Sequence, residues 1–216
     1  NAEDPFRGFL PSVGRLVKYR PPETVEGQVR VDTGVFEGGE ISMYYDSMIA
    51  KLIVHGGTRD QAIARLRDAL NAFVIRGIDS NIPFQAALMQ NPRFLSGVFT
   101  TAFLAEEYPD GFVAADVVHD DPGLLAALAA FGRRRYIDRA VQVSGQMAGH
   151  QRKVGDEWVV QMEGKDYPVV VKPIPGGYSV THGADRYDLV SDWKFGELVF
   201  HGTCNGAPIC LQLERI

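Results

Sequence analysis

The second half of the chain carries a regular β pattern, which limits the fold more than any other sequence feature. From Glu157 onward, short apolar-rich runs alternate with local turn signals at intervals of about ten residues. Even spacing with local turns predicts an antiparallel meander that forms either a barrel or a sandwich. The expected strands are 157–162, 167–172, 177–182, 186–192, 197–204 and 207–215.

The last hairpin of this pattern fixes the positions of the two cysteines. Asn205-Gly206 is typical of a two-residue turn, because both positions must tolerate a positive φ. The resulting register pairs Cys204 with Ala207 and His201 with Cys210. The two cysteines then lie three rungs apart, roughly 10 Å, whereas a disulfide needs Cα atoms within about 7 Å. We therefore expect two free thiols and a reducing compartment.

A long helix and a long loop precede the β pattern. Asp121 followed by Pro122 makes a good N-cap and N1 pair, and the apolar spacing predicts one helix over 121–142. Its arginine run at 133–135 is expected to form a solvated face. The segment 144–155 has no periodicity and predicts a loop, either a functional one or a flexible linker.

The first half of the chain mixes short strands and helices. Capping-box spacing at Thr58 and Gln61 predicts the start of a helix, and Gly77 is a candidate for the residue that ends it. The apolar run 48–54 favours an interior strand. Further expected elements are strands at 16–19 and 28–32, helices at 82–90 (capped by Asn81) and 101–108, and a linker at 113–119.

Composition narrows the function classes. The 216 residues are 45% apolar and 23% charged with a net charge of −5, which fits a globular protein and predicts no nucleic-acid partner. No apolar run approaches the roughly 20 residues that span a bilayer, so no membrane partner is expected. The five histidines lack metal-ligand spacing with the cysteines, and we assign no metal site.

The densest polar cluster is Tyr44-Tyr45-Asp46-Ser47, directly before the apolar run 48–54. An acid at a strand entrance can orient an arginine through a bidentate bond. The alternative is an Asx-turn that only shapes the backbone, and spacing alone favours it. Two acids in NAEDP, before Pro5, likewise predict a turn. From the residues alone, the chain has two domains and no self-contained active site.

The first half contains six linked motifs, NAEDP, LPSVGRL, VRVDTGV, YYDSMIAKLIVHG, TRDQAIARL and IRGIDSNI, and TTAFLAEEYPDGF follows at 100–112. Together these motifs resemble one known family, the biotin-dependent acyl-CoA carboxylases. The first half is similar to the C-terminal subdomain of biotin carboxylase, and residues 100–112 look most like the α subunits of propionyl-CoA carboxylases. The helix and meander that follow resemble the BT domain of those subunits.

This resemblance implies an α+β fold in two parts. Residues 1–112 would form the biotin carboxylase C-terminal subdomain, and residues 113–216 the BT domain. In the family, the BT domain is a long central helix surrounded by an eight-stranded antiparallel barrel. The barrel therefore looks truncated at the C-terminus, with two strands expected after Ile216.

The resemblance also implies a reaction and its partners. ATP and bicarbonate carboxylate biotin on its carrier domain, and a carboxyltransferase β subunit transfers the carboxyl group to the acyl-CoA. ATP and Mg would bind mainly to an upstream domain and biotin to a downstream carrier, so the segment alone is expected to be inactive. A hetero-oligomer of α6β6 type in the bacterial cytoplasm is expected, with the mitochondrial matrix as the alternative.

The resemblance assigns roles to two groups of residues. Asp46 would help to hold an arginine of the biotin site, with Tyr45 and Lys51 in support. The loop after the long helix would dock the β subunit, and Met147 would either fill a pocket there or fold back onto the barrel. The docking residues expected in this loop are Ser144, Gln146, Met147, His150 and Arg152. Alternative functions are a methylcrotonyl-CoA or other acyl-CoA carboxylase, and a non-enzymatic helix-plus-barrel module.

Overall fold

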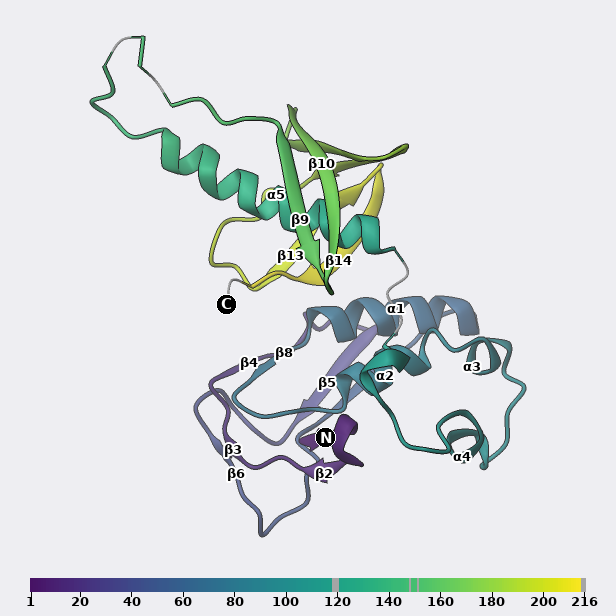
Figure 1. Cartoon of the computed structure of the whole chain (residues 1–216). Helices are drawn as coiled ribbons and strands as arrows, with labels where there is room; N and C mark the ends of the chain where they lie inside the picture. The colour runs from purple at the N-terminus through teal and green to yellow at the C-terminus, as the bar shows by residue number, and fades with distance from the viewer. Residues whose placement is uncertain (118–120, 148, 151, 215–216) are drawn as a thin grey trace. The chain divides into compact units, whose positions relative to one another are not determined.

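The structure is a computed structural model that describes residues 1–117, 121–147, 149–150 and 152–214. It divides into two compact units, Asn1–Val118 and His119–Ile216. Both units combine helices and strands, which confirms the α+β class (Figure 1). No helix in the described parts of the chain is long and apolar enough to cross a membrane.

The second unit contains one six-stranded antiparallel sheet in which every strand pairs with its neighbour in the chain. This confirms the predicted meander and excludes a sandwich of two sheets among the described residues. β9 and β14 each pair on one side only, so the sheet is not closed into a barrel. Its strands are β9 (Glu157–Met162), β10 (Lys165–Ile174), β11 (Gly177–His182), β12 (Asp185–Val190), β13 (Val199–Cys204) and β14 (Ala207–Gln212).

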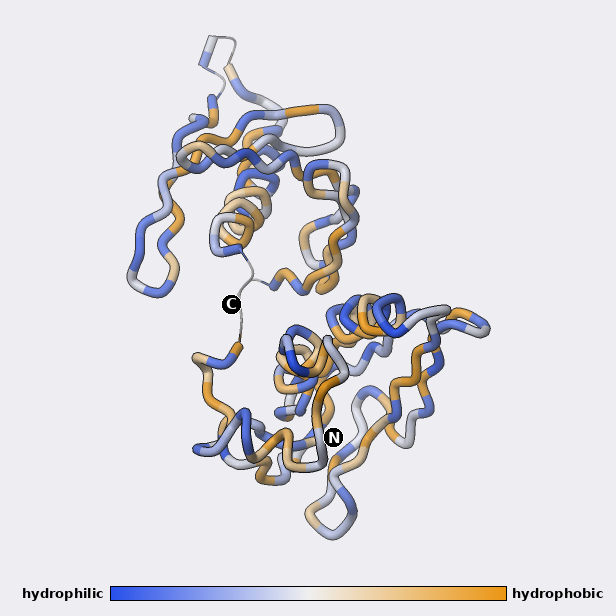
Figure 2. The backbone as a smooth tube through the Cα atoms, turned by 90° about the vertical axis from the view of Figure 1, so that its right-hand side faces the viewer, coloured by the Kyte–Doolittle hydropathy of each residue, from blue (hydrophilic) through white to orange (hydrophobic). Residues whose placement is uncertain are grey.

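Helix α5 (Pro122–Val141) packs inside the curve of this sheet, and Figure 2 shows it mostly in apolar colours. Asp121 caps it as predicted: its Oδ1 accepts a hydrogen bond from the Leu124 N–H at 3.1 Å. The Tyr187 hydroxyl of β12 donates to the same oxygen, also at 3.1 Å. Gly123 is required here, because a Cβ would lie 2.3 Å from that hydroxyl oxygen. The helix start is thereby fixed to the sheet.

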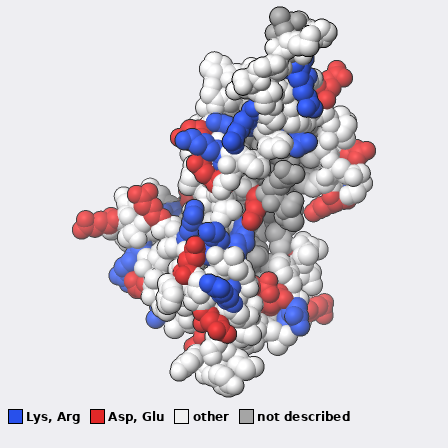
Figure 3. Space-filling view, turned by 90° about the vertical axis from the view of Figure 1, so that its left-hand side faces the viewer, with Lys and Arg blue, Asp and Glu red and all other residues white. Residues whose placement is uncertain are grey.

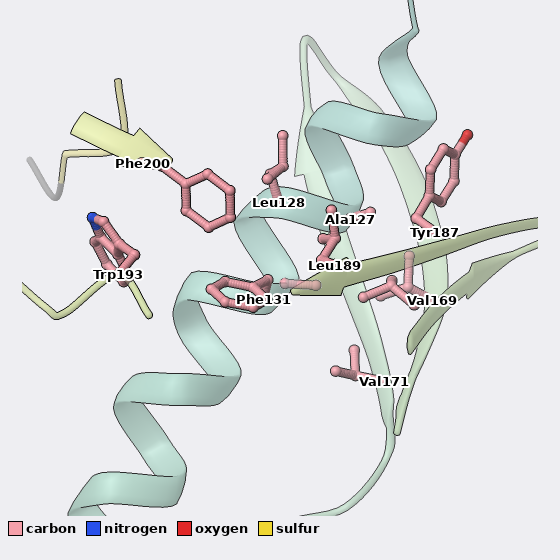
Figure 4. Close-up of a cluster of buried hydrophobic side chains, with 11 residues drawn as sticks. Ala127, Leu128, Phe131, Val169, Val171, Tyr187, Leu189, Trp193 and Phe200 are labelled. Carbon is pink, nitrogen blue, oxygen red and sulfur yellow. The ribbon is translucent and has the colours of Figure 1, made fainter. Parts of the chain in front are cut away.

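The core of the second unit lies between α5 and the sheet (Figure 4). Phe131 is fully buried and meets the rings of Phe200 and Tyr178 edge-on, at centroid distances of 5.3 and 5.4 Å. Burial of a side chain of this size contributes about 1.5–3 kcal/mol to folding. The other buried members are Ala127, Leu128, Ala130, Val169, Val171, Val180, Tyr187, Leu189, Trp193 and Phe200.

The last hairpin has the predicted register. Cys204 pairs with Ala207 and His201 pairs with Cys210, and both cysteines are free thiols. Burial raises the pKa of the Cys204 thiol, with the carboxylates of Asp121 and Asp188 adding to the shift. Cys204 therefore behaves as a small, half-buried core residue rather than as a nucleophile.

The first unit is built from four separate antiparallel strand pairs. The prediction of an interior strand over 48–54 was wrong, because β7 has one partner and exposes Lys51 and Ile53. The pairs are β1 (Glu3–Asp4) with β2 (Leu10–Pro11), β3 (Gly14–Arg15) with β6 (Glu40–Ile41), β4 (Lys18–Arg20) with β8 (Val74–Arg76), and β5 (Val29–Thr33) with β7 (Ala50–Val54).

Helix α1 (Arg59–Ala72) begins as predicted but ends earlier. Thr58 accepts a hydrogen bond from the Gln61 N–H at 3.2 Å, while the Gln61 side chain accepts from Gly57 rather than from Thr58. Gly77 does not end the helix, since strand β8 intervenes. It instead adopts a φ of +98°, and a Cβ there would lie 2.2 Å from the Arg15 carbonyl oxygen.

The remaining helices of the first unit are short. Asn81 precedes α2 but makes no side-chain cap, because its Oδ1 accepts from the Asn1 ammonium group. Pro92 begins a further helix that the sequence did not predict. The expected linker contains a 3-10 turn, and its residues 118–119 lie outside the described residues. The elements are α2 (Ile82–Leu88), α3 (Pro92–Ser96), α4 (Phe103–Glu107), η1 (Pro5–Arg7) and η2 (Ala114–Asp116).

Candidate docking loop and the Asp46 segment

The loop 142–156 joins α5 to β9 and is the most prominent projection of the second unit. Together with the last turns of α5 it extends beyond the sheet (Figure 1). Its described residues form neither helix nor strand, as predicted. Loops of this length within a compact unit are commonly functional or disordered, so the contacts within it decide between a defined surface and a flexible linker.

Gln146 organises the first part of this loop, residues 142–147, which is called the outgoing limb below. Its Nε2 donates to the carbonyl of Val141 and, at 3.1 Å, to that of Val143, where the helix leaves carbonyls without partners. Its Oε1 accepts from the Arg152 backbone N–H at 3.1 Å. The backbone of Met147 and His150 adds a turn with an N–H to carbonyl distance of 3.0 Å. Gln146 therefore holds the loop together from within.

The loop presents apolar side chains to solvent. Met147 is 72% exposed, so the alternative in which it folds back onto the sheet was wrong. Val143 is exposed beside it at the helix end. Ser144, His150 and Arg152 are also exposed, whereas Gln146 is half-buried. An exposed methionine on a loop held by its own hydrogen bonds is a surface that can fill a partner's pocket.

Arg134 anchors the last part of the loop, residues 152–156, which is called the return limb below. The prediction of a solvated arginine face was wrong for this residue, which is 5% exposed. Its Nε donates to Asp138 at 2.9 Å, and its Nη1 donates to Asp156 at 3.0 Å. Nη1 also reaches the carbonyls of Val171 at 3.0 Å and Gly155 at 3.2 Å. The signal missed in the sequence was Asp138, an acid one helical turn after Arg134.

Tyr178 of β11 completes this cluster of polar groups. Its hydroxyl donates to Asp138 Oδ2 at 2.8 Å, and its ring lies under the Arg134 guanidinium. Burial, followed by the hydrogen bond to Asp138, raises the pKa of Tyr178 to about 12. The hydroxyl thus stays a donor at neutral pH and links the helix to the sheet.

The Asp46 segment lies in the first unit, before β7. Asp46 Oδ1 accepts from the Met48 N–H at 3.3 Å, which is the Asx-turn that spacing favoured. Tyr45 is 84% exposed, and Lys51 lies on the exposed side of β7 opposite Asp32. Among the residues described, no hydrogen bond or ion pair joins Asp46, Tyr45 and Lys51 to one another. The Asp46 carboxylate is exposed and keeps acceptor capacity for a further donor.

Contacts with the N-terminal residues fix this segment in place. The Ser47 hydroxyl donates to Glu3 at 2.6 Å, and the Ala2 N–H donates to the Ser47 carbonyl at 2.7 Å. Asn1 Nδ2 donates to the same Glu3 oxygen at 2.9 Å. Asp4 makes the predicted turn by accepting from the Phe6 N–H. The contact between Ser47 and Glu3 joins residues 44 positions apart. Such a contact leaves no pattern in the local sequence, and the sequence analysis did not predict it.

Both units match known protein families. The biotin carboxylase C-terminal domain matches residues 1–106, and the propionyl-coenzyme A carboxylase BT domain matches residues 125–216. The chain belongs to the biotin-dependent carboxylase family. The predicted family resemblance is thereby confirmed for both halves of the chain.

Curated relatives agree with this assignment. The propionyl-CoA carboxylase alpha chain of Ruegeria pomeroyi is 45% identical over 100% of this chain and 34% of its own length. The mitochondrial alpha chain of Caenorhabditis briggsae is 48% identical over 67% of this chain and 20% of its own. Biotin carboxylase 1 of Bacillus subtilis is 50% identical over 48% of this chain and 23% of its own. The chain thus spans about a third of the relative that matches it throughout.

Charged side chains of both signs lie on the surface. The net charge is −5. Figure 3 shows positive and negative side chains interspersed on the face in view, rather than a continuous basic surface.

Proposed function

We propose that the chain is part of the biotin carboxylase subunit of a propionyl-CoA carboxylase. In this reaction ATP and bicarbonate carboxylate carrier-bound biotin, and a carboxyltransferase β subunit then carboxylates the acyl-CoA. The observation that carries the proposal is the similarity of the whole chain to a propionyl-CoA carboxylase alpha chain, with both domains in the same order. The 216 residues alone are expected to be inactive.

The test is bicarbonate fixation by the complex that co-purifies with the full-length chain containing this sequence. Fixation that needs ATP and has its highest kcat/KM with propionyl-CoA supports the proposal. A higher kcat/KM with methylcrotonyl-CoA would assign a different acyl-CoA carboxylase. A chain that binds no carboxyltransferase and fixes no bicarbonate would contradict the proposal and favour a non-enzymatic interaction module.

We infer that ATP, Mg and biotin bind mainly to domains outside this sequence, with biotin on a downstream carrier domain. Among the described residues, no three His, Cys, Asp or Glu side chains gather where they could hold a metal ion. The carboxylate of Asp46 is instead suited to hold an arginine of the biotin site. The Asx-turn and the anchored Ser47 support this role, with Tyr45 and Lys51 nearby in the chain. Asp46 is thus a positioning residue.

The Asp46 role is tested in the complete enzyme with Asp46→Asn, which keeps the shape of the side chain. Loss of a charge-assisted bidentate bond is expected to lower kcat for biotin carboxylation by roughly tenfold or more, while the KM for ATP changes little. Asp32→Asn is the matched control, because Asp32 is an exposed carboxylate of the same unit that pairs with the exposed Arg30. Equal kcat values for Asp46→Asn and wild type would refute this role.

We further propose that the loop 142–156 docks the carboxyltransferase β subunit. The exposed Met147 and Val143 supply apolar area, and Gln146 keeps the loop in shape without using the outer face of Met147. Ser144, His150 and Arg152 would form the polar rim. Met147→Asp should weaken β-subunit binding strongly. Val98→Asp is the control, since Val98 is equally exposed, at 74%, but lies in the first unit.

We infer that the six-stranded sheet is part of a barrel that surrounds α5. In support, β9 and β14 each pair with one strand only among the described residues, and a largely apolar pocket of about 480 Å³ opens near the end of β14. Open edges and apolar surface of this kind are normally covered. The pocket is lined chiefly by Ala129, Gly132, Tyr136, Trp193, Phe195 and Leu213. Hydrogen exchange at β14 in the full-length chain tests this, since a covered edge is protected.

The assembly and its location follow from the same proposal. We infer a hetero-oligomer with the β subunit, of α6β6 type, in the bacterial cytoplasm. A bacterial relative matches the whole chain, and two free thiols fit a reducing compartment. The mitochondrial matrix is the alternative, since animal relatives are mitochondrial. The mass of the purified complex in solution decides the stoichiometry.

A further inference from the structure

One buried guanidinium joins three segments at the base of the docking loop. Arg134 lies on α5, and its acceptors are Asp138 on the same helix, Gly155 and Asp156 on the loop, and Val171 on β10. The return limb has further bonds at the same place. The Val171 N–H donates to the Asp156 carbonyl at 2.8 Å, and Trp158 Nε1 donates to the Gly155 carbonyl at 2.7 Å.

Fold stability alone does not require this arrangement. Taking a charge out of water is costly, and a buried ion pair is often no more stable than apolar side chains of similar size. Arg134 is 5% exposed, although apolar residues of the core lie on the same helix. What an arginine supplies here is geometry, because its planar group can bond acceptors from several segments at once.

We propose that Arg134 is a positioning residue for the docking loop. With Asp156 it fixes the return limb, while Gln146 fixes the outgoing limb at the end of α5. The two attachments present Met147 to the carboxyltransferase β subunit in one conformation. The proposal rests on the docking function proposed above. It adds that Arg134 orders the loop before the β subunit binds.

The benefit of such positioning is a lower entropic cost of binding. A loop that is free in solution must be ordered when its partner binds, and that cost reduces affinity. A loop held at both ends before binding avoids much of it. Loosening one end should therefore weaken binding of the β subunit although no contact residue has changed.

The test uses Asp156→Ala in the full-length chain. Asp156 is 45% exposed, so its removal leaves the core intact and leaves Arg134 its bonds to Asp138 and Val171. We expect the Kd for the β subunit to rise about tenfold, the effect of losing roughly one charge-assisted hydrogen bond. Amide exchange across 142–156 should become faster, while β10 and β11 keep their protection. Asp166→Ala is the matched control, because Asp166 is an exposed acid on β10 that accepts a hydrogen bond from Gln161.

Comparison with a second variant, Arg134→Met, separates positioning from stability. Methionine keeps most of the apolar volume but leaves Asp138 and the Val171 carbonyl without the guanidinium, so the melting temperature is expected to fall in Arg134→Met and to stay nearly unchanged in Asp156→Ala, while loop exchange and Kd rise in both. Unchanged loop exchange and unchanged Kd in both variants would overturn the proposal.

Failure of the docking function gives a different pattern. If the loop does not dock the β subunit, Met147→Asp will leave β-subunit binding intact. That result refutes the presentation of Met147 to this partner, even if Asp156→Ala loosens the loop. Tight binding by Asp156→Ala together with its loss in Met147→Asp would instead refute the positioning role alone.

Discussion

The two units hold their exposed candidate segments in place by different kinds of contact. The second unit packs one helix against a single sheet whose strands pair in chain order, and its loop 142–156 joins that helix to the sheet. The first unit has no common sheet among its described residues, and its Asp46 segment depends on a contact between Ser47 and Glu3, 44 residues apart. Damage to the one core should therefore disable the second unit as a whole, whereas the first unit should lose local parts.

The largest expected effect comes from the centre of the second unit. Phe131→Ala removes the ring that contacts Phe200 and Tyr178 and should lower the free energy of unfolding by about 3–5 kcal/mol. Differential scanning calorimetry should show the transition of the second unit moving to lower temperature as one cooperative step. Phe36→Ala is the control, because Phe36 is exposed in the first unit. A shift no larger than that control would contradict a single shared core.

A smaller and local effect is expected in the first unit. Ser47→Ala removes the 2.6 Å hydrogen bond to Glu3 and should cost about 1 kcal/mol. Amide exchange should rise at 43–48 and around β1, and stay unchanged in α2. Ser42→Ala is the comparison, since Ser42 makes only a bond to Tyr44 two residues away. Faster exchange throughout the unit would mean that the first unit is as cooperative as the second.

A further effect concerns the stability of the second unit at alkaline pH. Burial raises the pKa of Tyr178 and of Tyr187 to about 12, and hydrogen bonds to Asp138 and Asp121 add to the shift. A raised folded-state pKa means that the neutral hydroxyls contribute stability below pH of about 10, which is lost as the pH rises towards 12. The second unit should therefore weaken in this window, with late phenolate absorbance for two tyrosines. Tyr178→Phe should reduce that weakening, and an unchanged alkaline profile would rule out the assignment.

Much of the second unit was predictable because its interactions are local. Turns such as Asn205-Gly206 set the hairpins, and the Asp121 cap set the start of α5. An exception was the buried Arg134, whose acceptors come from three segments. In the first unit, β8 was missed and Gly77 was placed wrongly, because β8 is defined by its distant partner β4 rather than by its own pattern.

The candidate site residues were predictable only in part. The sequence indicated an exposed loop and an acid at a strand entrance, and the family resemblance gave them roles. Neither the sequence nor the resemblance indicated that Gln146 bonds within the loop or that Ser47 bonds to Glu3. Such contacts depend on side-chain directions that only the folded backbone determines.

The central claim is that the loop 142–156 joins this subunit to a carboxyltransferase. The most direct test replaces 143–153 by a short Gly–Ser linker in the full-length chain, which keeps Gly155, Asp156 and the Arg134 contacts. Sedimentation of this variant mixed with the β subunit should show two separate species, whereas the wild-type chain forms one large complex. A variant that still forms the large complex, with the mass of the wild-type assembly, would contradict the claim.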